Sequence, residues 1–218
     1  MRDALTLYTH PMSRGRIARW MIEETGLPYD EVILDFNTSM KSPDYLAINP
    51  MGKVPALKHG DVVITENAAI CMHLADLVPQ KHFAPEAGNA LRGSYYRWML
   101  FLAGPLEAYM TAKYSGNLAP GFSAGYGSDG EVLDVLEGVV SQGPHIIGDR
   151  FTTVDLYAAA TLGYYMRIKA LQPRPAFERF VEIHQSRPAF LRANEIDNAL
   201  VPAHPHPMMA ATTSRAEH

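Results

Sequence analysis

The sequence has one cysteine, Cys71, among its 218 residues. A single cysteine excludes an internal disulfide, a Cys-x-x-Cys redox pair and a zinc site built from several cysteines. A long apolar run is also missing: the longest nearly uncharged stretch, residues 154–166, contains Asp155 and is too short to cross a bilayer. The opening "MRDALTLY" has an acid and no apolar signal region, so we expect a cytoplasmic protein without membrane contact.

A large excess of charge of one sign is missing as well: the chain has 19 lysine and arginine residues and 23 aspartate and glutamate residues. The formal net charge of −4 disfavours a general nucleic-acid binder, and the apolar content of 47% is ordinary for a globular protein. The nine histidines are scattered along the chain, so we predict no bound metal. Two of them, His204 and His206, lie in a proline-interrupted segment, and residues 203–218 are expected to form a flexible tail.

The first eighty residues alternate between strand and helix patterns. Strands are expected at 4–8, at 31–36 and on both sides of a tight turn at 59–61; helices are expected at 14–25, 42–48 and 66–78. A strand–helix–strand crossover followed by a hairpin and a closing helix predicts a mixed sheet of four strands.

The second part of the chain is helical throughout. We predict an α/β domain at 1–79, a linker at 80–88 and an all-α domain at 89–202. Pro105 is expected to bend the first long helix of the second domain.

One helix start in the second domain carries a sharp local signal. In "FTTVDL", Thr152 is expected as the N-cap and Asp155 as its partner in a capping box. The helix that follows is apolar on nearly every side, which predicts that it lies buried at the centre of its domain.

Four motifs stand in order along the chain. The first half carries "LYTHPMSRGRIARWMIEETGLPYD", "NPMGKVPAL" and "TENAAIC", and the helical half carries "IIGDRFTTVDL". At these spacings the chain resembles the cytosolic glutathione transferase family, in its serine-type form. The resemblance implies a thioredoxin-like first domain that binds glutathione as co-substrate, a helical second domain, and a homodimer that acts in detoxification.

The resemblance also implies which residues meet the cysteinyl and glycyl parts of glutathione. Val54 is expected to pair its backbone with the cysteinyl unit, and the Val54–Pro55 bond is expected to be cis. Lys53, and less directly Lys41, are expected to face the glycine carboxylate.

Glu66 and Asn67 are expected at the γ-glutamyl end. Glu66 suits the ammonium group, and the helix that begins beside it offers free N–H groups and partial positive charge to the carboxylate. Asn67 stands where the family more often has serine, and it still supplies a donor.

Ser13 is the first choice for the partner of the glutathione sulfur. A free thiol has a pKa of about 8.5, so a hydroxyl donor and a helix N-terminus aimed at the sulfur would favour the thiolate. Thr9 and His10 lie in the same turn and remain alternatives, whereas Tyr8 ends the first strand and is expected in the core. Arg14 or Arg16 would add positive potential.

The sequence gives less information about the pocket for the acceptor substrate. The resemblance favours a pocket for a small hydrophobic electrophile, with candidate lining residues Met12, Tyr96, Met99, Tyr109 and Tyr114. Three functions stay open: a glutathione transferase, a glutathione-dependent isomerase or peroxidase on the same scaffold, and a non-catalytic binding module.

Overall fold

The computed structural model describes residues 4–204, and their packing divides into two compact units. The first unit contains the residues up to Leu74 together with those from Pro188 onward, and the second contains Ala75–Arg187. The domain boundaries predicted from the sequence, at residues 79, 88 and 202, stay predictions. Of the expected flexible tail, residues 205–218 lie outside the described part of the chain, whereas His204 lies within it.

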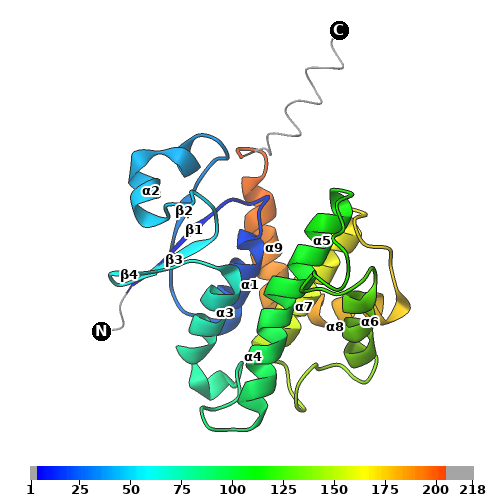
Figure 1. The fold of residues 1–218 in the computed structure, drawn as a ribbon. Helices are drawn as coiled ribbons and strands as arrows, with labels where there is room; N and C mark the ends of the chain where they lie inside the picture. The colour runs from blue at the N-terminus through cyan, green and yellow to red at the C-terminus, as the bar shows by residue number, and fades with distance from the viewer. Residues whose placement is uncertain (1–3, 205–218) are drawn as a thin grey trace. The chain divides into compact units, whose positions relative to one another are not determined.

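The first unit is built on a four-stranded sheet (Figure 1). Its order is β2-β1-β3-β4, with β1 parallel to β2, and with β3 antiparallel to both β1 and β4. The predicted mixed sheet, with its crossover and hairpin, is confirmed. Its elements are β1 (Leu5–Thr9), α1 (Gly15–Thr25), β2 (Asp30–Ile33), the 3₁₀ turn η1 (Ser39–Lys41), α2 (Pro43–Ile48), β3 (Ala56–His59), β4 (Val62–Ile64) and α3 (Asn67–Asp76), whose last residues enter the second unit.

The second unit is helical, as predicted. It contains η2 (Pro79–Lys81), α4 (Leu91–Phe101), η3 (Leu102–Leu106), α5 (Glu107–Tyr114), α6 (Glu131–Val140), α7 (Thr153–Arg167) and α8 (Pro175–Gln185). The interruption expected at Pro105 takes the form of the π-helical turn η3 between α4 and α5. Helix α7 is buried along most of its length and forms the expected centre of the helical unit.

The last described helix, α9 (Pro188–Leu200), packs against α1 in the first unit. At this contact the rings of Trp20 and Phe190 meet edge to face, with centroids 4.8 Å apart. Arg19 lies 1% exposed, and its guanidinium reaches the carboxylates of Asp197 at 2.9 Å and Glu31 at 2.7 Å. Burial lowers the pKa of Arg19, but Asp197, Tyr29 and Glu31 together outweigh burial and raise it, so the side chain is a buried cation held between α9 and β2.

The predicted capping box at the start of α7 is confirmed. Asp155 is buried, and its carboxylate accepts hydrogen bonds from the backbone N–H of Thr152 at 2.8 Å and of Ile146 at 2.7 Å. The carboxylate therefore fixes both the helix start and the loop before it. Burial nevertheless raises the pKa of Asp155 to about 6, against the donors that favour its ionised form.

We expect Arg19→Met to lower the free energy of unfolding of the first unit by about 3–5 kcal/mol, because it leaves the carboxylate of Asp197 buried without its cation. Urea denaturation followed by circular dichroism would measure the loss. Arg192→Met is the matched control, because Arg192 of α9 reaches Glu23 of α1 from an exposed position, so its loss should cost less than about 1 kcal/mol. Equal losses in the two variants would contradict the role given to Arg19.

The pH dependence of stability provides a second prediction. Between the ordinary pKa of 3.8 and the folded value of about 6, Asp155 holds a proton in the folded chain that the unfolded chain has released. Its contribution to stability therefore falls as pH rises through this window. Asp155→Asn cannot titrate and should cost roughly 1–3 kcal/mol, and wild type should exceed it by more at pH 4 than at pH 7. An advantage that grows with pH would show that the carboxylate is ionised in the fold.

Candidate functional site

The turn between β1 and α1 holds the three candidate sulfur partners. Burial alternates along β1, so Thr9 shares the buried face of the strand with Leu5 and Leu7. Thr9 and His10 are both fully buried, whereas Ser13 is only half-buried. Of the three predicted candidates, Ser13 is therefore the one whose side chain retains exposed surface.

The Ser13 hydroxyl both donates and accepts a hydrogen bond within its own turn. It donates to the backbone carbonyl of His10 at 2.8 Å and accepts the backbone N–H of Gly15 at 2.9 Å. The second bond satisfies one of the open N–H groups at the start of α1. A sulfur that took this hydroxyl as donor would replace the His10 carbonyl and leave the bond to Gly15 in place.

The other candidates near the turn have different surroundings. His10 accepts the backbone N–H of Met12 through Nδ1 at 3.0 Å, and its ring packs on Phe36. Arg16, expected to add positive potential, donates to Asn194 at 2.6 Å and to Asn198 at 2.8 Å on α9. These two bonds hold α9 against α1, and because amide oxygens are neutral they leave the positive charge of Arg16 in place.

Two residues that the sequence analysis did not name as site residues stabilise the segment before β3 by hydrogen bonds. The carbonyl of Lys53 accepts the hydroxyl of Tyr45 at 2.6 Å and the side-chain amide of Asn49 at 2.9 Å. Burial raises the pKa of Tyr45 to about 12, which keeps its hydroxyl protonated as a donor. In the sequence, the only local indication of this support is Asn49, the first residue of "NPMGK".

Gly52 and Lys41 shape the same segment. Gly52 has a φ of 56°, and a Cβ there would lie 2.6 Å from the carbonyl oxygen of Met40. The ammonium of Lys41 donates to the carbonyls of Met51 at 3.0 Å and Gly52 at 2.9 Å. Lys41 thus stabilises the turn at residues 51 and 52. The next residue, Lys53, has an exposed side chain.

Val54 and Pro55 directly precede β3, and Val54 is the residue predicted to pair its backbone with glutathione. The Val54–Pro55 peptide bond is cis, as expected. The backbone N–H and C=O of Val54 make no hydrogen bond with any residue between 4 and 204. In the register of β1 with β3, Tyr8 faces Ala56, so the chain beyond β1 runs past Pro55 and Val54.

The Glu66–Asn67 pair lies at the start of α3. Glu66 is exposed and has a φ of 65°, a conformation that non-glycine residues adopt at a cost and that is common at functional sites. The side-chain amide of Asn67 donates to the carbonyl of Arg14 at 2.9 Å. This bond ties the start of α3 to the Ser13 turn, so all three predicted motifs meet at one end of the sheet.

The candidate acceptor residues have mixed environments. Met12 is half-buried in the first unit. In the second unit Met99 and Tyr109 are fully buried, whereas Tyr96 and Tyr114 are exposed. The hydroxyl of Tyr109 donates to Asp129 at 2.7 Å and accepts from Lys113 at 2.8 Å. An acceptor pocket made of these residues stays a prediction.

One cluster in the second unit has the composition of a metal site. His145, Asp155 and His184 bring ligand-type atoms within 4.8 Å of one another. Both oxygens of Asp155 already accept hydrogen bonds, one from Thr152 in the capping box and one from the backbone N–H of Ile146, and Nε2 of His184 lies 2.6 Å from the carbonyl of Pro144. These bonds explain the cluster as support for the start of α7.

Comparison with known proteins gives the family. Residues 3–76 match the model of the glutathione S-transferase N-terminal domain, and residues 119–188 match that of the C-terminal domain. The chain is 30% identical to glutathione S-transferase 3 of Zea mays over 237 residues, which cover 95% of this chain and 99% of that protein. The chain belongs to the glutathione S-transferase family.

Solved structures agree with the fold. A glutathione transferase of Methylococcus capsulatus strain Bath is 25% identical with a TM-score of 0.75, over 90% of this chain and 100% of that one. A glutathione transferase homologue from Sulfitobacter, determined with bound glutathione, is 25% identical with a TM-score of 0.72, over 88% and 98%. Within residues 4–204, no helix has the length and apolar character needed to cross a membrane.

Gly52→Ala tests the tight turn that places Val54. We expect a loss of about 2–4 kcal/mol in the free energy of unfolding, because the new Cβ combines an unfavourable φ with a clash against the Met40 carbonyl. Gly116→Ala is the matched control, since Gly116 has a φ of 71° and nothing within 4 Å of the new Cβ. It should lose only about 1 kcal/mol. Similar losses in the two variants would remove the clash as an explanation.

Proposed function

We propose that this chain is a glutathione transferase that stabilises the thiolate of bound glutathione for attack on a small hydrophobic electrophile. The observation that carries the proposal concerns the half-buried Val54, whose backbone N–H and C=O make no hydrogen bond within residues 4–204 and lie next to the Ser13 turn. An extended peptide pairs naturally with such an edge, as a strand added to a sheet does. The homologue from Sulfitobacter, whose structure contains glutathione, supports the choice of peptide.

The ends of glutathione would be held by charge. The exposed carboxylate of Glu66 suits the γ-glutamyl ammonium, and the open N–H groups of the ten-residue helix α3 suit the neighbouring carboxylate. The amide of Asn67 gives one of its two N–H donors to Arg14 and retains the other for the ligand. At the opposite end, Lys53 would attract the glycine carboxylate, with Lys41 adding charge from the turn below.

The chemical work would be done at the sulfur. The hydroxyl of Ser13 donates to the thiolate in place of the His10 carbonyl, and the start of α1 adds partial positive charge. The thiol proton leaves to solvent. The thiolate then forms a carbon–sulfur bond with the electrophile, whose leaving group departs with the bonding electron pair. On the strength of the resemblance, we place this activity in a cytoplasmic homodimer that detoxifies electrophiles.

Calorimetric titration with glutathione, combined with the ultraviolet absorbance of bound thiolate, tests this proposal. Glu66→Ala should bind glutathione about tenfold or more weakly, because a charged partner of the ammonium is lost. Ser13→Ala should bind nearly as wild type but raise the pH at which bound thiolate appears by about 1–2 units.

Two control variants sharpen the test. Glu195→Ala removes an exposed carboxylate elsewhere in the first unit and should leave binding unchanged. Ser13→Thr retains a hydroxyl and should restore most of the thiolate. Wild-type protein that binds no glutathione at millimolar concentration would overturn the proposal. Binding without any shift in the thiol pKa would favour a non-catalytic binding module.

A further inference from the structure

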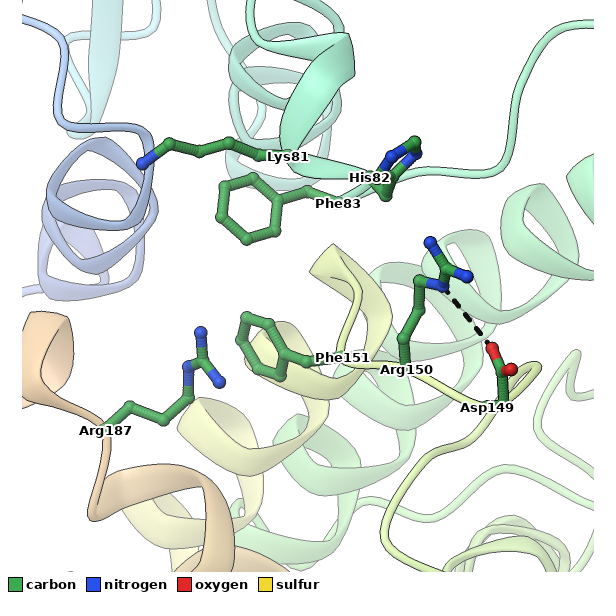
Figure 2. Close-up of a pocket in the computed structure, with 7 residues that line it drawn as sticks. All are labelled: Lys81, His82, Phe83, Asp149, Arg150, Phe151 and Arg187. Carbon is green, nitrogen blue, oxygen red and sulfur yellow. Dashed lines mark hydrogen bonds and ion pairs between the residues drawn. The ribbon is translucent and has the colours of Figure 1, made fainter.

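The second unit contains a pocket of about 350 Å³ between the segments 81–83 and 149–151 and beside Arg187. Its volume would suit a small molecule, but Figure 2 shows that its cationic side chains point away from one another. The lining therefore does not converge on one ligand. Polar groups do converge in the first unit, where the hydroxyls of Thr9 and Ser13 both approach Gly15, the first residue of α1.

The hydroxyl of Thr9 is a buried polar group without a hydrogen bond. The side chain is fully buried, and Oγ1 has no hydrogen-bond partner within residues 4–204. The backbone of Thr9 is fixed, because its carbonyl accepts the N–H of Leu34 at 2.9 Å and the residue pairs with Ile33 in the register of β1 with β2. A buried hydroxyl without a partner lowers the stability of a fold. Such groups are rare in native proteins, and a role in binding or catalysis is one reason for them.

Gly15 provides the space that the Thr9 hydroxyl occupies. A Cβ at position 15 would overlap Oγ1 of Thr9 and would lie 3.0 Å from Oγ of Ser13. Glycine has no Cβ, so no side-chain atom of residue 15 separates the two hydroxyls. Movement of the Thr9 hydroxyl toward this space brings it into hydrogen-bonding range of the Ser13 oxygen.

The Ser13 oxygen can accept one more hydrogen bond. A hydroxyl has one O–H to donate and can accept two hydrogen bonds. Ser13 donates to the carbonyl of His10 and accepts the N–H of Gly15 at 2.9 Å. No second donor reaches its oxygen within the described part of the chain. The open acceptor of Ser13 and the unused donor of Thr9 therefore complement each other.

We propose that Thr9 is a positioning residue that makes Ser13 a stronger donor to the sulfur of glutathione. This inference rests on the role proposed above for Ser13. Thr9 donates to the Ser13 oxygen while Ser13 donates to the thiolate, so two hydrogen bonds form a chain that ends at the negative charge. Hydrogen bonds in such a chain polarise and strengthen one another. Thr9 does not touch the ligand, because its side chain is fully buried.

Thr9→Val separates this role from a structural one, because it replaces the hydroxyl with a methyl group of similar size. Loss of a buried donor that has no partner in the ligand-free fold should leave the urea midpoint unchanged or raise it. The same variant should bind glutathione nearly as wild type does, and it should raise the pH at which bound thiolate appears in the ultraviolet by about one unit. Thr9→Ser retains the hydroxyl and should restore nearly the wild-type pH.

Thr25→Val is the matched control. Thr25 is a buried threonine of α1 whose hydroxyl donates to the carbonyl of Ile22 at 2.6 Å and accepts the N–H of Leu27 at 3.1 Å. Its replacement should lower the urea midpoint and leave the ionisation of bound glutathione unchanged. If Thr9→Val gives this same result, the Thr9 hydroxyl has a structural role only and the inference is overturned.

A double-mutant cycle shows whether Thr9 acts through Ser13. In the Ser13→Ala background, Thr9→Val should cause no further rise in the pH at which thiolate appears. A further rise as large as the one in wild type would show that Thr9 acts independently, which contradicts the proposal. If Ser13→Ala raises this pH and Thr9→Val does not, the inference fails and the proposed function stands. If Ser13→Ala has no effect on the bound thiolate, both fail.

Discussion

The antiparallel pairing of β1 with β3 is the constraint on which the proposed glutathione site depends. With Tyr8 opposite Ala56, the end of β1 lies beside the beginning of β3, so the Ser13 turn and the Val54 edge become neighbours although forty residues separate them along the chain. A slip of one residue would exchange the two faces of β1 and bring Thr9 out of the core. Register, rather than proximity in the sequence, therefore determines which hydroxyl is available to a ligand.

In each unit, a buried charged side chain joins two segments of the chain. In the first unit the cation of Arg19 joins α1 to Asp197 of α9, and in the second the carboxyl of Asp155 joins the start of α7 to the loop before it. Burial affects the ionisation of the two side chains differently. Arg19 remains charged because carboxylates face it, whereas burial shifts Asp155 toward its neutral form. Arg19 thereby supports α1, which follows the proposed sulfur-binding turn at Ser13, and Asp155 supports the first turn of α7.

The order of elements could be predicted because it follows from local periodicity and turn residues. The end of β2 shows the limit: the apolar pattern predicted a strand to Phe36, but the strand ends at Ile33 because Leu34 turns to pack with Met40 and Tyr45. Apolar spacing alone does not distinguish a strand from a buried loop. Long-range partners were also beyond prediction, since Arg19 and Asp197 are 178 residues apart and neither leaves a local pattern. The family motifs predicted glutathione contacts at Val54 and Glu66, which stay predictions, but they did not indicate the hydrogen bonds by which Tyr45 and Asn49 support the segment before β3.

The bonds of Ser13 bear on how such a site would prefer one ionisation state of glutathione. In the structure its hydroxyl is satisfied by the neutral carbonyl of His10. A neutral thiol is a weak acceptor and would gain little by displacing that carbonyl. A thiolate is charged, and charge-assisted hydrogen bonds are roughly twice as strong as neutral ones, so it would displace the carbonyl with a net gain. The competing carbonyl would thus cancel the gain for a thiol but only part of the gain for a thiolate, so the hydroxyl would turn toward the sulfur only when the sulfur is ionised. On this argument, the proposed role of Ser13 would be to lower the pKa of the bound thiol rather than to raise the affinity for glutathione.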